Sequence, residues 1–384
     1  MGKAGKKFGW LTDRHDFAGS TWLHVHGWFD GIACEREADD EGGGDTLFVI
    51  DCNVWPPAEE DMSELRPDVD GADLMLVGVE EGRRYWRRRI ELADYGERDV
   101  FQYEVSVGPE VEPVGPPLTG NFYAIDCVVA AGVIYGLHQL EAGRRSVTRL
   151  SGGEVTTLLE PEGEVVLTTL GPGRLLISTR NLHLTDPHDA RYWIWDERAG
   201  LSAPRHYPLV PVQVDSALAW LGGDEILFCS KTSEPHANNM AGHEYTLHLH
   251  RFDVATGALR SAALEGFGST LKFDARMLVT QPKQPVVLRS FEGTIDIARG
   301  ADGWWILNYR TQHAGKRTIC WLWHEPTDTV VPIASADMPG HDVLAVLYSP
   351  GLAGYLVSVP HAIFRLARLD DIVAYRGGTS LCWT

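Results

Sequence analysis

Four histidines gather in the segment SEPHANNMAGHEYTLHLH and are the residues of this chain that most resemble a metal site. They are His236, His243, His248 and His250. His248 and His250 are two residues apart, so on a β-strand both side chains point to one face, where neutral imidazoles are able to share a metal ion. The insertion before this strand supplies His236, His243 and Glu244 as further ligands or as groups that orient the ligands.

The same spacing occurs at His24 and His26, in TWLHVHGWF. Alternating histidines on a half-covered strand are commonly packed and hydrogen-bonded, whereas a metal site needs three or four ligands that converge with a fixed geometry. The metal hypothesis is therefore the alternative interpretation. It predicts one transition metal ion held by His243, His248 and His250, in a hydrolase or lyase that acts on a small or sugar-like substrate.

Nucleophilic catalysis has less support, because the chain holds no Gly-x-Ser-x-Gly or His-Glu-x-x-His motif. Carboxylate pairs such as Asp370-Asp371 are expected by chance among 53 acidic residues, so none is assigned a glycosidase role. Catalytic residues stay unknown, and the sequence favours a protein that is not an enzyme.

The densest charge lies between Glu35 and Asp73, where fourteen acidic residues face Arg36 and Arg66, a net formal charge of −12. Gly and Pro in ADDEGGGD and PPAEEDMSELRPDVD predict loops on either side of the strand TLFVIDCNVW. Such a run is either a solvated surface that aids solubility or a docking surface that attracts a cationic partner and repels anionic competitors. The residues predicted to bind the partner are Asp39, Asp40, Glu41, Asp45, Glu59, Glu60 and Asp61.

A basic run with two aromatic residues follows at once, from Arg83 to Arg89. Taken alone, it suits nucleic acid, because aromatic rings stack on bases and arginines neutralise phosphates. Strand alternation sends Arg84, Trp86 and Arg88 to one face and the other four residues to the opposite face, so neither face is simply basic. Pairing with the neighbouring carboxylates is the alternative, and the net charge of −19 disfavours nucleic acid.

Thirteen tryptophans suggest a planar or sugar ligand, but Trp in a strand more often fills the space between packed sheets. We expect this wedge role for the tryptophan pairs in predicted strands, namely Trp193 and Trp195, Trp304 and Trp305, and Trp321 and Trp323.

The elements that position these residues recur along the chain. Residues 164–209, 217–264 and 294–334 each read as four short strands around one longer connection, with turns such as GPG, GGD and ADG. Weaker copies begin near Trp22, Ala72, Phe122 and Val343, whereas the stretch from Gly266 to Phe291 does not fit the period. The spacing of roughly 40 to 50 residues predicts about seven four-stranded units, in the range of a β-propeller.

The chain therefore resembles the β-propeller superfamily over most of its length. Trp195-Asp196 at the end of a third strand is similar to a Trp-Asp repeat, and Gly152-Gly153 and Gly222-Gly223 are similar to kelch doublets. The resemblance implies an all-β, single-domain fold over residues 1–384 with six to eight blades. Ring closure would pair the N-terminal segment through Phe29 with the C-terminal strands through Trp383 near one seam, because open edges invite aggregation.

Composition places limits on compartment and partner. The charge of −19 keeps the chain soluble and favours a basic protein partner over nucleic acid or a membrane. Six cysteines without a Cys-x-x-Cys pair read as reduced, mostly buried thiols. The N-terminal residues have no apolar run long enough for a signal peptide, so cytoplasmic residence is expected.

The sequence favours a non-enzymatic interaction protein whose acidic rim binds a basic protein and which needs no cofactor. One concrete form is a bacterial immunity or antitoxin protein that covers a basic toxin domain.

Overall fold

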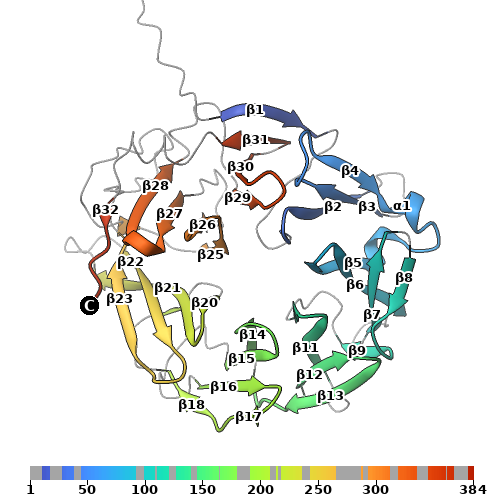
Figure 1. The fold of residues 1–384 in the computed structure, drawn as a ribbon, viewed down its shortest axis with the longest axis horizontal. Helices are drawn as coiled ribbons and strands as arrows, with labels where there is room; N and C mark the ends of the chain where they lie inside the picture. Colours follow the sequence, from blue (N-terminus) through green and yellow to red (C-terminus); the bar gives the residue numbers. More distant parts are fainter. Residues whose placement is uncertain are drawn as a thin grey trace, which may run out of the picture.

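The computed structural model describes residues 11–17, 28–38, 45–91, 99–108, 110–120, 127–139, 145–163, 165–179, 191–207, 213–214, 218–235, 243–264, 287–288, 293–311, 319–334, 345–359, 361–366 and 379–384. Their strands form seven antiparallel sheets, arranged in a ring around a common centre (Figure 1). The chain is a seven-bladed β-propeller. We number the blades along the chain from the sheet that follows the N-terminal strand.

Blades 1 to 4 follow one another along the chain, each with its first strand nearest the centre (Figure 1). Their strands are β2 (Ile32–Ala38), β3 (Asp45–Asp51) and β4 (Ala58–Asp61) in blade 1; β5 (Leu74–Glu80), β6 (Arg83–Glu91), β7 (Asp99–Val107), β8 (Glu110–Pro113) and β9 (Leu118–Gly120) in blade 2; β10 (Cys127–Ala130), β11 (Val133–Gln139), β12 (Arg145–Ser151) and β13 (Glu154–Leu159) in blade 3; β14 (Val165–Thr169), β15 (Arg174–Thr179), β16 (Arg191–Asp196), β17 (Gly200–Leu201) and β18 (Arg205–His206) in blade 4.

Blades 5 to 7 complete the ring, and two of them contain strands from distant parts of the sequence. Their strands are β19 (Gln213–Val214), β20 (Ala219–Gly222), β21 (Glu225–Pro235), β22 (His243–Asp253), β23 (Leu259–Ala263) and β24 (Val287–Leu288) in blade 5; β25 (Gly293–Arg299), β26 (Trp304–Thr311), β27 (Ile319–His324), β28 (Thr329–Ala334) and β32 (Thr379–Ser380) in blade 6; β29 (Ala345–Ser349), β30 (Gly354–Val359), β31 (Ala362–Leu366) and β1 (Leu11–Asp16) in blade 7. The short helices are α1 (Met62–Leu65), η2 (Gly71–Asp73) and η5 (Glu325–Thr327).

The predicted units at 164–209, 217–264 and 294–334 correspond to blades 4, 5 and 6, so the propeller prediction is confirmed. The weaker copies near Ala72, Phe122 and Val343 begin within a few residues of blades 2, 3 and 7, while Trp22 lies outside the described residues. Blade 1 shows three strands within the described part, and residues 18–27, which precede these strands, lie outside it. Most of the segment from Gly266 to Phe291 also lies outside it.

Ring closure differs from the expectation. The N-terminal strand β1 forms the outer strand of blade 7, where Arg14 pairs with Phe364 and Asp16 with Ala362. The C-terminal β32 does not join this seam, because it pairs with β28 on blade 6 (Figure 1). The N-terminal strand therefore belongs to blade 7, whereas the C-terminal strand belongs to blade 6.

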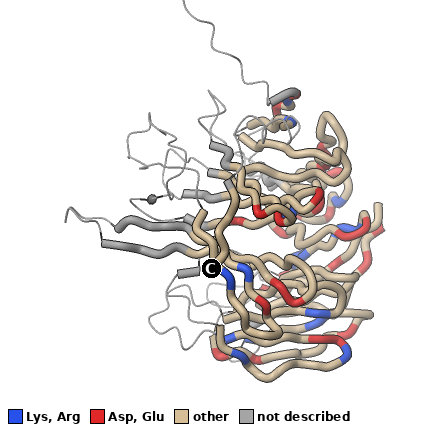
Figure 2. Tube along the Cα trace, turned by 60° about the vertical axis from the view of Figure 1, so that its left-hand side comes forward, with Lys and Arg blue, Asp and Glu red and all other residues tan. Residues whose placement is uncertain are grey.

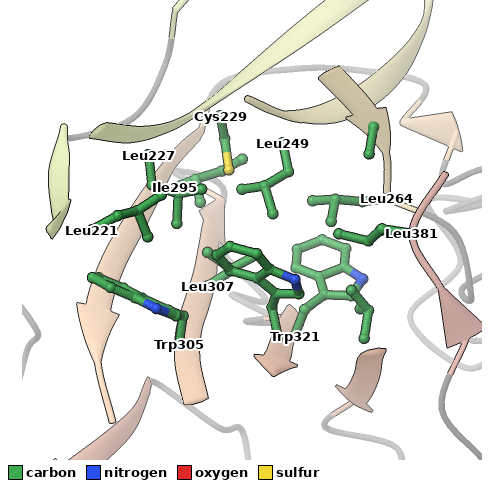
Figure 3. Close-up of a cluster of buried hydrophobic side chains, with 13 residues drawn as sticks. Leu221, Leu227, Cys229, Leu249, Leu264, Ile295, Trp305, Leu307, Trp321 and Leu381 are labelled. Atoms are coloured by element: carbon green, nitrogen blue, oxygen red, sulfur yellow. The ribbon is translucent and has the colours of Figure 1, made fainter. Parts of the chain in front are cut away.

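The core consists of seven hydrophobic clusters, and each lies between two neighbouring blades. Trp305, Trp321 and Trp323 are at most 2% exposed in the cluster between blades 5 and 6, which is the predicted wedge role (Figure 3). Trp193 and Trp195 are half-buried against the cluster between blades 3 and 4, and half-buried Trp304 packs on the cluster between blades 6 and 7. Burial between blades is thus the main source of stability.

Each pair of neighbouring blades is also joined by a polar contact. The contacts are Arg84–Glu60 (blades 1 and 2), Glu80 with the amides of Ala131 and Gly132 (2 and 3), Arg149–Glu197 (3 and 4), Arg174–Asp224 (4 and 5), Arg251–Glu325 (5 and 6), the Ala301 amide with the Tyr355 hydroxyl (6 and 7), and Asn53 with the Gly351 amide (7 and 1). Because hydrogen bonds are directional, these contacts orient the blades that the hydrophobic clusters hold together.

Two-residue turns precede the second strand of blades 2, 3 and 6 and the strand β2 of blade 1. Asp30-Gly31, Glu81-Gly82, Ala131-Gly132 and Asp302-Gly303 all have positive φ at both residues. Such turns match the twist of a hairpin and favour Gly at the second position. Cys52, Cys229 and Cys320 are buried free thiols, as expected from their scattered positions.

Candidate functional site

The acidic segment from Glu35 to Asp73 forms blade 1 and the connection to blade 2. The second of its two predicted loops is wrong in part, because Ala58–Asp61 is strand β4, the outermost strand of the blade, and Met62–Leu65 is helix α1 (Figure 1). Glu59, Glu60 and Asp61 thus belong to a sheet edge. Two prolines precede this strand, and it lacks the alternation of apolar and polar residues that indicates a strand. The sequence therefore did not predict β4.

Glu60 is already paired within the protein. Its two carboxylate oxygens accept hydrogen bonds from the Arg84 guanidinium at 2.6 and 3.0 Å. This contact holds the pKa of the Glu60 carboxyl below its usual range. A bidentate pair fixes the side chain and offsets its charge, so Glu60 offers a partner less than an unpaired carboxylate would.

Glu59 faces the ring seam. Its Oε1 lies 3.3 Å from Nε2 of His15 on β1, so blade 1 touches the N-terminal strand here. The Glu59 side chain is 33% exposed, and Asp61, two positions along the same strand, is half-buried. Glu59 therefore combines an interblade contact with access to solvent.

The exposed charge of this region continues beyond β4, in the connection to blade 2. Glu64, Asp68 and Asp70 are exposed, and an oxygen of Asp70 accepts the Ala72 amide at 2.8 Å. Leu65 lies among them with 56% of its surface exposed. Sequence reasoning counted these acids but did not single them out.

Three of the predicted contact residues, Asp39, Asp40 and Glu41, lie outside the described residues. Asp45 begins β3, and its side chain is also outside the described part. Register places Ala38 opposite Asp45 and Phe48 opposite Asp61, so β2 ends and β3 begins at the end of the sheet toward which β4 runs. The described residues neither confirm nor contradict a role of these acids in binding.

The basic run forms β6, a central strand of blade 2, and four of its five arginines contact acidic or aromatic side chains of the protein. Arg88 donates to Glu104, and Arg89 pairs with Asp73. Arg87 is 2% exposed, with its guanidinium 3.7 Å from the centre of the Phe101 ring. Pairing with neighbouring carboxylates, the alternative to a nucleic-acid surface, is what the structure contains.

Glu104 links the acidic connection to blade 2. It accepts Arg88 at 2.6 Å and lies 2.8 Å from Arg66, with its own side chain 6% exposed. A carboxylate buried between two arginines is costly to remove, because both cations would lose their partner. This bridge fixes the segment that carries Leu65 onto the body of blade 2.

The histidine pair lies on β22 in blade 5, where both residues point to one face as predicted, with their ring centres 6.2 Å apart. His250 is 2% exposed, and both of its ring nitrogens are hydrogen-bonded: Nε2 to the Ser230 hydroxyl and Nδ1 to the Ser261 hydroxyl at 2.8 Å. Burial, followed by the nearby His248, lowers the pKa of His250 to about 3. His250 is thus neutral and joins β21, β22 and β23.

The other predicted ligands fall outside what the structure describes. His236 is outside the described residues, and so is the side chain of His243. Among the residues that the structure describes, no group of three or more His, Cys, Asp or Glu is arranged to hold a metal ion. The metal hypothesis stays a prediction, and a test of it has to include His243.

A second buried histidine, His138 on β11, was missed by sequence reasoning. It is 3% exposed and lies against the rings of Phe101 and Tyr103 at centroid distances of 5.7 and 5.8 Å. Burial, with a smaller contribution from the positive charge of Arg87, lowers the pKa of His138 to about 3. The residue sits in LHQL without a neighbouring histidine, so no local pattern marks it.

Two general properties of the described part of the chain are its distribution of charge and the length of its helices. In Figure 2, Asp and Glu positions, in red, are more frequent than Lys and Arg positions, in blue, along the described chain. No helix within the described ranges is long and apolar enough to cross a membrane.

No family model matches this sequence, and no curated protein matches it. Among solved structures, one similar fold is "YCF48 bound to D1 peptide", at 10% identity and a TM-score of 0.49, covering 93% of this chain and 95% of that one. Another is a puromycin-hydrolyzing peptidase of Mycobacterium tuberculosis, at 12% identity and a TM-score of 0.47, covering 85% and 48%. A third is an ulvan lyase of polysaccharide lyase family PL25, at 10% identity and a TM-score of 0.45, covering 95% and 98%.

Proposed function

We propose that this chain is a non-enzymatic interaction propeller of the bacterial cytoplasm that binds a basic protein through the acidic edge of blade 1. The leading contact residues are Asp39, Asp40, Glu41, Asp45, Glu59, Glu60 and Asp61, to which we add Glu64, Asp68 and Asp70 because they are exposed nearby. The fold supplies a rigid frame. The acidic edge supplies the specificity.

The observation that carries this proposal is the position of β4. It pairs with β3 on one side, and no other strand of the described residues joins its outer edge. Three consecutive carboxylates on an edge strand repel the same edge of a second copy, because like charges oppose pairing. The same carboxylates attract a cationic surface and steer its approach.

One biological form of the proposal is an immunity or antitoxin protein that covers a basic toxin domain. The formal charge of −19 favours rapid encounter with such a domain, because long-range attraction increases association rates. A propeller edge held by interblade contacts would bind with little ordering cost.

The proposal predicts a slower association after charge removal. The test variant replaces Asp39, Asp40, Glu41, Glu59, Glu64 and Asp68 by Asn or Gln and keeps Glu60, because Arg84 would otherwise lose its partner. Association with the basic protein recovered by affinity purification should slow by at least about tenfold at low salt, and its salt dependence should flatten. Stopped-flow measurements at several salt concentrations give both quantities.

A matched control removes the same charge from other blades. It replaces six acidic residues that are exposed in the structure, namely Glu81, Glu110, Glu112, Glu154, Glu162 and Asp302. If both variants associate equally slowly, net charge alone controls the association rate, and the acidic edge of blade 1 is not the binding surface. The control variant should keep the unfolding free energy of the wild type to within about 1 kcal/mol, because exposed positions contribute little.

The second candidate is the metal-assisted hydrolase or lyase, which the stacked His248 and His250 rings favour. It predicts that protein purified without chelator retains about one equivalent of a transition metal, lost after His248→Ala and His250→Ala. Metal bound at His250 would have to replace one of its two serine contacts. Elemental analysis that finds no metal would remove this candidate for these two residues.

A further inference from the structure

The C-terminal residues Thr379–Thr384 lie on the outer wall of the ring, across blades 5 and 6 (Figure 1). Strand β32 adds to the free edge of β28, where Ser380 pairs with Thr329 and Thr379 with Val330. The Leu381 amide then donates to the carbonyl of Asp328 at 2.8 Å. The segment is therefore held by its backbone as an added strand.

Side chains at alternate positions of this C-terminal segment pack against the outer wall of blades 5 and 6. Leu381 is 9% exposed and belongs to the cluster between blades 5 and 6, at the end of that cluster where Leu264 also lies (Figure 3). Trp383 is half-buried, with its ring edge-on to Trp323 at 5.9 Å and the Arg260 guanidinium 5.9 Å from its centre. Ser380, Cys382 and Thr384 are exposed, as alternation in an extended chain requires.

The last residue reaches the neighbouring blade. The Thr384 amide donates to the Ser261 carbonyl at 2.8 Å, and the Ser261 amide donates back to the Thr384 carbonyl at 3.0 Å. Ser261 belongs to β23, the outer strand of blade 5. One segment of six residues thus connects the outer edges of two blades.

Blade 6 is complete without this segment. Strands β25 to β28 already form a four-stranded sheet, as in blades 3 and 7, and β32 is a fifth strand with two ladder pairs. An extended peptide that adds to a sheet edge gains affinity from backbone hydrogen bonds and specificity from pockets for alternate side chains. The wall between blades 5 and 6 offers both, with places for a Leu and a Trp two residues apart.

We propose that the outer wall of blades 5 and 6 is a peptide-binding site for an extended segment of the pattern Leu-x-Trp, and that the chain's own residues 379–384 fill it in cis. The site is separate from the acidic edge of blade 1. Its ligand is apolar and is recognised through the edge of β28 and the backbone of Ser261. A partner with this pattern binds when it displaces the C-terminal segment.

The test measures uptake of a fluorescent peptide with the sequence of residues 379–384, with Cys382→Ser, by fluorescence anisotropy. A chain that ends at residue 378 should bind it saturably, and at least about tenfold more tightly than the full chain, in which the tethered segment competes at high effective concentration. The same peptide with Leu381→Ser and Trp383→Ser should bind at least about tenfold more weakly. Arg260→Ala should weaken binding by about two- to fivefold, as expected for a cation–π contact.

A locked variant keeps the proposal testable if the shortened chain does not fold. The full chain with Thr329→Cys, Ser380→Cys and Cys382→Ser joins two directly paired positions by a disulfide. The reduced form should take up peptide at high concentration, and the oxidised form should not. The proposal is overturned if neither chain takes up peptide, if the altered peptide binds equally well, or if oxidation leaves uptake unchanged.

Discussion

Deletion of residues 1–17 is expected to lower the free energy of unfolding by about 5 kcal/mol and to make the chain associate, because it removes the outer strand of blade 7. Strand β1 pairs with β31 from Leu11 to Asp16, and the Phe17 amide donates to the His361 carbonyl at 3.0 Å. Phe17 is 7% exposed in the cluster between blades 7 and 1.

Several terms combine to give that effect. Burial of a Phe side chain contributes about 2 to 3 kcal/mol, and each lost backbone hydrogen bond about 1 kcal/mol. A loss of this size is a large part of the stability of an ordinary domain. Deletion also exposes the edge of β31, which another chain is then free to pair with.

Urea unfolding and size-exclusion chromatography measure the two consequences. Deletion of residues 1–10 is the control, since it leaves β1 in place, and Phe17→Ala should account for about 3 kcal/mol by itself. A monomeric protein with the wild-type urea midpoint after deletion of residues 1–17 would contradict the closure described here.

The repeat pattern was enough to predict the architecture, because each blade is built from local hairpins whose turns are visible in the sequence. The Glu81-Gly82 and Asp302-Gly303 turns carry this information within a few residues. Closure was not predictable in detail. The pairing of Leu11 with Leu366 joins residues from opposite ends of the chain, and the pairing of Thr379 with Val330 involves only two residues.

The acidic segment shows a second property that the sequence alone did not predict, namely which of its carboxylates are paired. Composition predicted the concentration of charge in blade 1, but which carboxylates remain available depends on contacts between blades. Glu60 and Arg84 are 24 positions apart and meet because β4 and β6 lie on neighbouring blades. The sequence alone offers Arg84 several acidic partners, and only the packing of blades 1 and 2 selects one.

The histidines show how packing decides between two interpretations of one pattern. Alternation correctly placed His248 and His250 on one face of a strand. Whether that face binds a ligand or packs internally depends on what covers it, and His250 is covered by Ser230 and Ser261 from the flanking strands. Ser230 lies three residues before the segment that holds the histidines and Ser261 lies eleven residues after His250, but no sequence pattern marks either serine as a hydrogen-bond partner of His250.

Acid should destabilise the protein well before its carboxylates titrate. His138 and His250 have pKa values of about 3 in the folded state, because burial disfavours the charged imidazolium, whereas histidine in an unfolded chain has a pKa near 6.5. Between these values the unfolded chain binds more protons than the folded chain, so the free energy of unfolding falls as pH falls. Each group contributes about 2 kcal/mol between pH 7 and pH 5, so we expect a loss of about 4 kcal/mol from the two.

Urea unfolding at pH 7, 6, 5.5 and 5 measures this loss in a range where most carboxylates stay ionised in both states. His138→Gln and His250→Gln should each lower stability at pH 7, since Gln does not reproduce the packing of an imidazole, but each should remove about half of the pH dependence. His206→Gln, at an exposed position on β18, is the matched control for the loss of an imidazole. If the double variant lost as much stability between pH 7 and pH 5 as the wild type, the two buried histidines would not be the source of acid sensitivity, because a group that is absent has no proton to bind.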